Sequence, residues 1–122
     1  MIVSSVRFPG VLLIRFSGID ALDTLSAVQA KTEAVALIDG TADVVVDLSG
    51  ITFLDSTGIA VLVSLVKAAR RKGRDAHFAA AGPEVRSVLA VIKLDRIFDL
   101  HPDVSSAAEA VKRMRDASAP CA

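Results

Sequence analysis

Residues 44–59 read VVVDLSGITFLDSTGI, and this stretch decides which fold the chain can adopt. It begins with an apolar, β-branched run without alternation, which is typical of a strand covered on both faces. A polar loop follows, and the loop ends in Asp55-Ser56-Thr57-Gly58 where a long apolar segment with helical periodicity begins. The sequence therefore predicts a carboxylate and two hydroxyls at the N-terminus of a helix, directly after a buried strand.

A helix N-terminus of this kind accepts added negative charge. Its first backbone N–H groups have no partner within the helix, and the helix dipole is positive there. Ser56 is therefore well placed to be a phosphorylation switch, with the alternative that its hydroxyl only caps the helix. Asp55 has the corresponding alternative of a charge that complements the dipole. The two roles of Asp55 are compatible, because a carboxylate there can cap the helix and orient the neighbouring hydroxyl.

Composition limits the classes of protein that fit. With 122 residues, of which 52% are hydrophobic, the chain is long enough for one domain with a real core. Its 14 basic and 14 acidic residues give a formal net charge of zero, which disfavours a nucleic-acid partner held by phosphate contacts. The single cysteine, Cys121, and the lack of metal-ligand spacing predict no disulfide, no metal and no cofactor. No signal-peptide pattern is present, and the longest apolar run, Ile59–Val66, falls short of the roughly 20 residues that span a membrane. We expect a cytoplasmic protein without membrane insertion.

The order of predicted elements defines the fold class. Strands are expected over Ile2–Arg7, Val11–Phe16, Val44–Leu48, Ala76–Ala80 and Ile97–Leu100. Helices are expected from Asp23 or Thr24 to Gly40, over Thr57–Lys72, from Pro83, and over Ser106–Met114, where Ser106 and Glu109 form a capping box. Alternating strands and helices imply parallel pairing, while the Pro9-Gly10 turn adds an antiparallel edge. We predict one α/β domain over residues 1–116, with a mixed, mainly parallel sheet, about four helices, and a flexible tail over residues 117–122.

Helical periodicity also predicts which side chains are buried. The buried face of the first helix is expected to hold Leu25, Val28, Thr32 and Val35, and that of the second Ile59, Leu62, Val63 and Val66. Val61 and Leu65 make the second helix apolar almost all round, either as further core or as part of a partner interface. The basic residues Lys67, Arg70, Arg71 and Lys72 at its end complement the helix dipole and predict a solvated helix end.

This pattern resembles the STAS domain, a family named for sulfate transporters and anti-sigma factor antagonists. The resemblance covers nearly the whole chain and rests on the Asp55-Ser56-Thr57-Gly58 motif in its strand–loop–helix setting. It is strongest over residues 44–69 and in LDRIFDL, residues 94–100, followed by the stretch 107–111. It implies a STAS-like fold.

The bacterial antagonists that this chain resembles are switched by a partner kinase, an anti-sigma factor with a GHKL-type ATP-binding domain. The unphosphorylated antagonist binds this kinase and frees the sigma factor; phosphorylation ends the binding, and a phosphoserine phosphatase restores it. The resemblance implies that Ser56 is the phosphoacceptor, with Thr57 as second choice. It implies partner binding through Asp23, Asp55, Ser56, Thr57 and Gly58, with Gly58 permitting a close backbone approach. Relatives often carry Gly-Glu-Leu-Asp after the second strand, and here either Asp20 or Asp23 takes the acidic position.

The residues also bear on three other functions: an enzyme, a transport subunit and a signalling scaffold. An enzyme is not expected, because the chain has no glycine-rich phosphate cradle and no metal ligands, and because no Gly-x-Ser-x-Gly elbow supports a hydrolase built from Ser56 and His101. His77 and His101 are expected to be structural. The alternatives to the antagonist are a STAS accessory subunit of a lipid-type ABC transport complex in a membrane, and a scaffold component of stress signalling.

Overall fold

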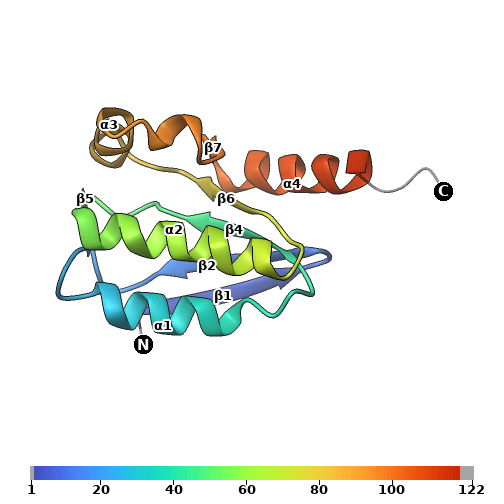
Figure 1. Ribbon diagram of the computed structural model, residues 1–122, viewed down its shortest axis with the longest axis horizontal. Coiled ribbons are helices and arrows are strands. Elements are labelled where there is room, and N and C mark those ends of the chain that lie inside the picture. The colour runs from blue at the N-terminus through green and yellow to red at the C-terminus, as the bar shows by residue number, and fades with distance from the viewer. Residues whose placement is uncertain (1, 119–122) are drawn as a thin grey trace.

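The computed structural model describes the backbone of residues 2–118 and the side chains of residues 2–113. Along the chain it contains β1 (Val3–Phe8), β2 (Val11–Phe16), β3 (Ala21–Leu22), α1 (Ala27–Leu37), β4 (Asp43–Asp47), β5 (Phe53–Leu54), α2 (Ser56–Arg71), β6 (Ala76–Ala79), α3 (Pro83–Val91), the 3-10 turn η1 (Leu94–Arg96), β7 (Leu100–His101) and α4 (Val104–Ser118). The predicted α/β class is confirmed (Figure 1).

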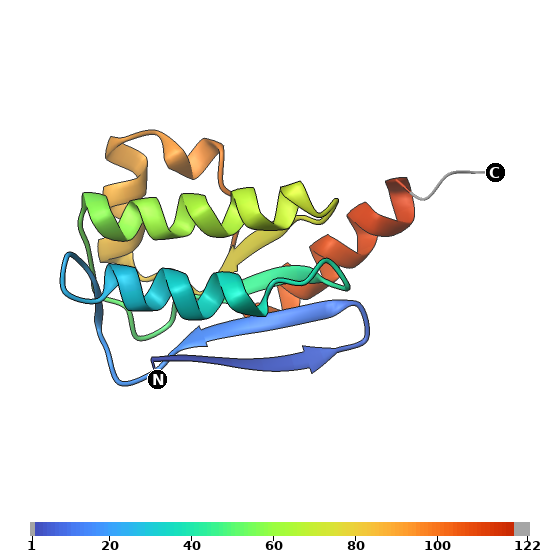
Figure 2. The same cartoon turned by 60° about the horizontal axis from the view of Figure 1, so that its bottom comes forward.

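The main sheet is mixed, as expected, and has the strand order β1-β2-β4-β6-β7. β1 and β2 are antiparallel across the Pro9-Gly10 turn, and the other neighbours are parallel. The large core cluster joins one face of this sheet to α1, α2 and α3, while a smaller cluster packs Ala107 and Val111 of α4 on the other face. Figure 2 shows α1 and α2 side by side above the strands, with β1 at the outer edge.

A second, two-stranded sheet was not predicted. β3 pairs in parallel with β5 through Ala21↔Phe53 and Leu22↔Leu54. Each strand has two residues, too few to show alternation in a sequence, and the partners lie far apart in the chain. The pairing joins the loop before α1 to the loop before α2, and so it positions the candidate site.

The predicted buried face of α1 is wrong. The side chains that α1 buries are those of Ala27, Ala30 and Ala34, whereas Leu25 and Val28 are 94% and 77% exposed. Small side chains allow α1 to lie close to its neighbours, so the larger apolar residues are left on the outside. Thr32 is also exposed. Of the four predicted residues, Val35 is the one that packs against the core, and it is partly buried.

In α2 the predicted stripe is partly correct. Leu62 and Val66 are buried, while Ile59 and Val63 pack against the core but stay partly exposed. Val61 and Leu65 are 2% and 0% exposed, so they belong to the core and are not available to a partner.

The C-terminal third departs from the prediction at two points. The strand expected over 97–100 is shifted: Phe98 is buried with its ring centroid 4.8 Å from that of Phe78, and β7 starts only at Leu100. The last helix begins at Val104 instead of Ser106, because Asp103 Oδ1 accepts the Ser106 N–H at 2.8 Å and so caps the helix.

The end of the chain also differs from the prediction. α4 continues to Ser118, beyond the predicted end at Met114. A flexible tail was predicted over residues 117–122. Its last four residues, 119–122, lie outside the described part of the chain. Between residues 2 and 118, no helix is long and apolar enough to cross a membrane.

Candidate functional site

Asp55 caps the N-terminus of α2. Its Oδ1 accepts the backbone N–H groups of Thr57 at 2.9 Å and Gly58 at 3.0 Å, and also the Thr57 hydroxyl at 2.5 Å. These hydrogen bonds favour the charged carboxylate: the Thr57 hydroxyl first, and then the Gly58 N–H, lower the pKa of Asp55 below its usual value. At neutral pH a negative charge therefore lies beside Ser56.

The same carboxylate joins two loops. Asp55 Oδ2 accepts the Thr24 N–H at 3.2 Å and the Thr24 hydroxyl at 3.4 Å. The Asp55 N–H donates to the Leu22 carbonyl at 3.3 Å. Asp55 thereby links the segment that enters α1 to the first turn of α2.

Gly58 allows a close backbone approach, and the approach is within the chain. A Cβ atom at this position would lie 2.0 Å from the Leu22 carbonyl oxygen and 2.9 Å from the Leu22 Cβ. The first turn of α2 therefore rests directly on β3, and a side chain at position 58 would force the two apart. The structure gives Gly58 a packing role at the base of the site.

Ser56 is the first residue of α2 and is exposed. Its hydroxyl makes no hydrogen bond to any residue that the structure describes, because Asp55 already caps the helix. The interpretation of Ser56 as a helix cap is therefore wrong. Thr57 differs: it is half-buried and its hydroxyl is held by Asp55. Of the two hydroxyls, Ser56 is the one open to an enzyme.

The structure separates the two acidic candidates before α1. Asp23 is half-buried, and its Oδ1 accepts the N–H groups of Leu25 at 3.0 Å and Ser26 at 3.2 Å, so it orders the turn that leads into α1. The Asp20 side chain is exposed and has no hydrogen bond or ion pair to a described residue. Its backbone carbonyl accepts the N–H groups of Thr52 and Phe53 and the Thr52 hydroxyl. Asp20 is thus the freer carboxylate, although the sequence analysis placed Asp23 in the partner-binding set.

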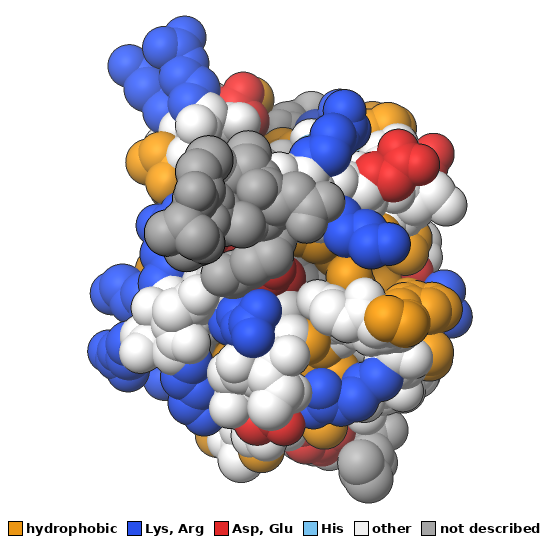
Figure 3. All heavy atoms as spheres, turned by 90° about the vertical axis from the view of Figure 1, so that its right-hand side faces the viewer, with side chains coloured by type: hydrophobic (Ala, Val, Ile, Leu, Met, Phe, Trp, Pro, Cys, Tyr) orange, Lys and Arg blue, Asp and Glu red, His pale blue; other side chains and the backbone are white. Residues whose placement is uncertain are grey.

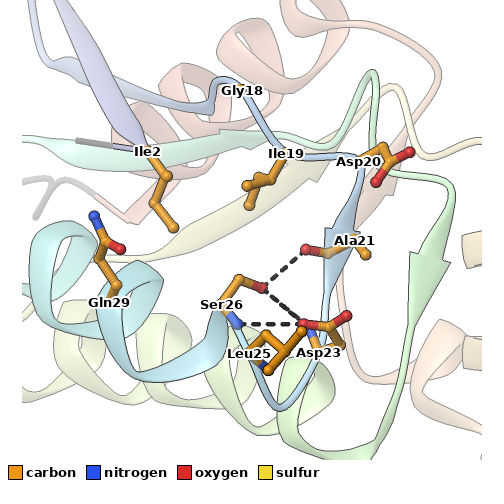
Figure 4. Close-up of a pocket in the computed structure, with 9 residues that line it drawn as sticks. All are labelled: Ile2, Gly18, Ile19, Asp20, Ala21, Asp23, Leu25, Ser26 and Gln29. Carbon is orange, nitrogen blue, oxygen red and sulfur yellow. Dashed lines mark hydrogen bonds between the residues drawn. The ribbon is translucent and has the colours of Figure 1, made fainter.

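A groove of about 350 Å³ lies between the loop after β2 and the start of α1 (Figure 4). It is lined by Ile2, Gly18, Ile19, Asp20, Ala21, Asp23, Leu25, Ser26 and Gln29. Figure 4 shows apolar side chains on its walls and both carboxylates at one side. The groove adjoins the first turn of α2. Thr24 lies in the chain between the lining residues Asp23 and Leu25, and its N–H donates a hydrogen bond to Asp55.

Three exposed apolar residues flank this site, and we call them the apolar rim: Leu25, Val28 and Phe53. Phe53 is 54% exposed and precedes Asp55 by two residues; Leu25 lies in the turn before α1, and Val28 lies in the first turn of α1. Leu25 and Val28 were predicted to be core residues. The alanines at positions 27, 30 and 34 follow a helical spacing that excludes positions 25 and 28, and this pattern could have predicted that Leu25 and Val28 are exposed.

The two histidines stack on the opposite face of the sheet, with His77 buried and His101 partly exposed. His77 is 1% exposed, and its Nδ1 lies 2.8 Å from Nε2 of His101. Burial lowers the pKa of His77, against the attraction of Asp99, whose carboxylate is 3.6 Å from Nε2. His77 pairs with Val45, which belongs to the cluster under α4. The sheet therefore separates these rings from Ser56, and no serine–histidine arrangement forms.

The basic residues at the end of α2 are partly engaged with neighbouring loops. Lys72 Nζ donates to the Ile38 carbonyl at 2.7 Å, and Arg70 lies 3.9 Å from Asp75. Figure 3 looks onto this end of the molecule, where Lys and Arg side chains lie in separate groups with acidic and neutral side chains between them. Among the described residues, no three His, Cys, Asp or Glu side chains gather in a way that could hold a metal ion.

Comparison with known proteins places this geometry in a family. The STAS domain model matches residues 3–107, and the chain therefore belongs to the STAS domain family. An anti-sigma factor antagonist from Mycobacterium paratuberculosis has 25% identity and a TM-score of 0.78, with 90% of this chain and 92% of that chain covered. An anti-sigma-factor antagonist (STAS) domain protein from Planctomyces limnophilus has 21% identity and a TM-score of 0.83, covering 90% and 97%. The Bacillus cell fate determinant SpoIIAA in its phosphorylated form has 16% identity and a TM-score of 0.65, covering 89% and 98%.

Proposed function

We propose that this protein is an anti-sigma factor antagonist that is switched by phosphorylation of Ser56. The observation that carries the proposal is the state of the Ser56 hydroxyl: it is exposed and unbonded at the N-terminus of α2, while Asp55 does the capping. A modification there removes no contact that the fold needs. The antagonists among the structural neighbours support the same role.

The apolar rim and Asp20 provide a surface for the partner. Burial of exposed apolar area is worth about 25 cal/mol per Å², so Leu25 and Val28 favour a partner that covers them. Asp20 and Asp55 add negative charge on the same side, which favours a partner with basic groups. We propose that this partner is an anti-sigma factor serine kinase of the GHKL type, and that a phosphoserine phosphatase reverses the reaction.

Phosphorylation would act at the interface and leave the fold intact. A phosphate adds about −1.5 to −2 charges at pH 7, and the N-terminus of α2 tolerates them. A partner packed over Ser56 would have to desolvate this dianion beside the Asp55 carboxylate, at a cost of several kcal/mol. Because about 1.4 kcal/mol changes affinity tenfold, that cost is enough to release the partner.

In this proposal the protein is a substrate and a binding module, and it has no catalytic activity of its own. Sigma factors act on RNA polymerase, so the proposal places the protein in the cytoplasm. The transport-subunit alternative requires no phosphorylation cycle.

The test is incubation with a GHKL-type serine kinase from the same cells and ATP, followed by mass spectrometry. We expect one phosphate, on Ser56, and none on the variant Ser56→Ala. Ser87→Ala, which changes an exposed serine on α3, is the matched control and should be phosphorylated like wild type. Equal phosphorylation of Ser56→Ala would overturn the assignment.

A further inference from the structure

Among the strands that the structure describes, β1 is an edge strand with one neighbour. It pairs with β2 on one side, and in the strand order nothing follows it on the other (Figure 2). All of its side chains after Val3 are exposed. An edge strand of ordinary length with free backbone groups is a template for pairing with another strand.

The register shows which backbone groups are free. The Ser17 N–H donates to the Ile2 carbonyl at 2.8 Å, so residue 2 directs its carbonyl toward β2. In an antiparallel pair this orientation alternates, so residues 4, 6 and 8 also face β2, while residues 3, 5 and 7 face outward. Glu33 Oε1 accepts the Val3 N–H at 3.0 Å. The outward N–H and C=O groups of Ser5 and Arg7 have no partner among the described residues.

The strand lacks the features that usually protect an edge. β1 contains no proline or glycine, and its pairing with β2 continues from Val3 to Phe8 without a bulge. Its only charged residue, Arg7, is held by Asp39 at 2.9 Å and by the Thr41 hydroxyl at 2.9 Å. Its charge is therefore balanced within the chain.

One face of the edge is also apolar. Val6 and Phe8 are 45% and 48% exposed, and they pair with Leu13 and Val11, which face α4. Phe8 and Val11 line a groove of about 320 Å³ against the first turns of α4. A strand added beside β1 would cover this apolar strip.

We propose that β1 pairs antiparallel with β1 of a second copy of this chain, which joins the two sheets across a two-fold axis. A second copy fits because an antiparallel edge is complementary to itself: the N–H and C=O groups of Ser5 and Arg7 in one copy meet the same groups in the other. In this arrangement Val6 of one copy lies opposite Val6 of the other. Because Arg7 is neutralised by Asp39 and the formal net charge of the chain is zero, there is little electrostatic repulsion between the copies. This proposal does not depend on the proposed function.

The test combines sedimentation with amide hydrogen exchange on the whole chain over a range of protein concentrations. We expect a dimer at high concentration, and protection of the Ser5 and Arg7 amides that rises with concentration. The Ser4 and Val6 amides, which face β2, should be protected at all concentrations and serve as an internal reference. Val6→Lys should abolish the dimer, because it places like charges across the two-fold axis. Val91→Lys, at an 81% exposed position on α3, is the matched control and should leave the dimer unchanged.

Three results would overturn the proposal. The first is a monomer at every concentration with fast exchange at Ser5 and Arg7, which would leave the edge to a strand of another protein. The second is a dimer in which these two amides stay unprotected, since it would use another surface. The third is a Val6→Lys variant that is folded by circular dichroism and dimerises like wild type.

Discussion

Replacing Gly58 by alanine tests the close packing beneath the candidate site. The new Cβ would lie 2.0 Å from the Leu22 carbonyl oxygen, and ordinary contact requires at least 3.4 Å, so α2 and β3 have to separate. Overpacking of this kind costs about 1–3 kcal/mol. Alanine regains up to about 1 kcal/mol of helix propensity over glycine, but the atom in the way is backbone and cannot rotate aside. We expect a net loss of about 2 kcal/mol in the free energy of unfolding.

Urea and thermal unfolding followed by far-UV circular dichroism measure this loss, because the chain has no Trp or Tyr. For a domain of this size, about 2 kcal/mol lowers the melting temperature by roughly 8 °C. Gly82→Ala is the matched control: its Cβ would meet only the flexible Glu84 carboxylate, at 3.2 Å, and we expect a loss below about 1 kcal/mol. A Gly58→Ala variant as stable as wild type would refute the close contact between α2 and β3.

Three further predictions concern the charges and the surface. Because the pKa of Asp55 is lowered, its carboxylate stabilises the fold above the unfolded value of 3.8, and this stabilisation is lost as the pH falls through the folded pKa. In urea titrations at acid pH, the free energy of unfolding of Asp55→Asn should therefore fall less with decreasing pH than that of wild type. Burial lowers the pKa of His77, so the free energy of unfolding should fall as the pH drops below the unfolded value of 6.5. His77→Leu should flatten this part of the stability curve, although His101, Asp99, Asp75 and Asp43 also face the ring, and an unchanged slope would contradict a neutral buried ring. Leu25→Ser should leave the unfolding midpoint within experimental scatter, because the side chain is 94% exposed, but should weaken binding to the kinase partner in calorimetry; unchanged binding would remove Leu25 from the interface.

Local patterns predicted the centre of the fold. The apolar run that forms β4, the motif and the apolar stripe of α2 lie within one continuous segment. The first is marked by its unbroken β-branched residues, the motif by helix-capping residues, and α2 by its helical periodicity. The Pro9-Gly10 turn likewise predicted the antiparallel edge. These features depend on residues that are close in sequence.

The missed features depend on contacts between distant segments. The pairing of β3 with β5 involves two residues on each side, and nothing in either loop shows that the other lies beside it. The buried face of α1 was missed because close helix packing selects alanine and leaves Leu25 and Val28 outside. A hydrophobicity pattern alone favours the larger side chains.

Within the site, sequence identified the segment but not the division of roles. Asp55, Ser56 and Thr57 all carry oxygens that can cap a helix, and only the observed geometry shows that Asp55 does so. In the same way, Asp20 and Asp23 are equivalent in sequence, and the turn into α1 engages Asp23 while leaving the Asp20 side chain exposed.

We expect a phosphate on Ser56 to release the partner without disturbing the fold. The most direct measurement is the affinity of authentic Ser56-phosphorylated protein for the anti-sigma factor kinase, by calorimetry, beside unphosphorylated protein and the Ser56→Ala variant. We predict that phosphorylation weakens binding by at least about tenfold, while Ser56→Ala binds like wild type and all three have similar unfolding midpoints. Equal affinity of the phosphorylated and unphosphorylated proteins would contradict it.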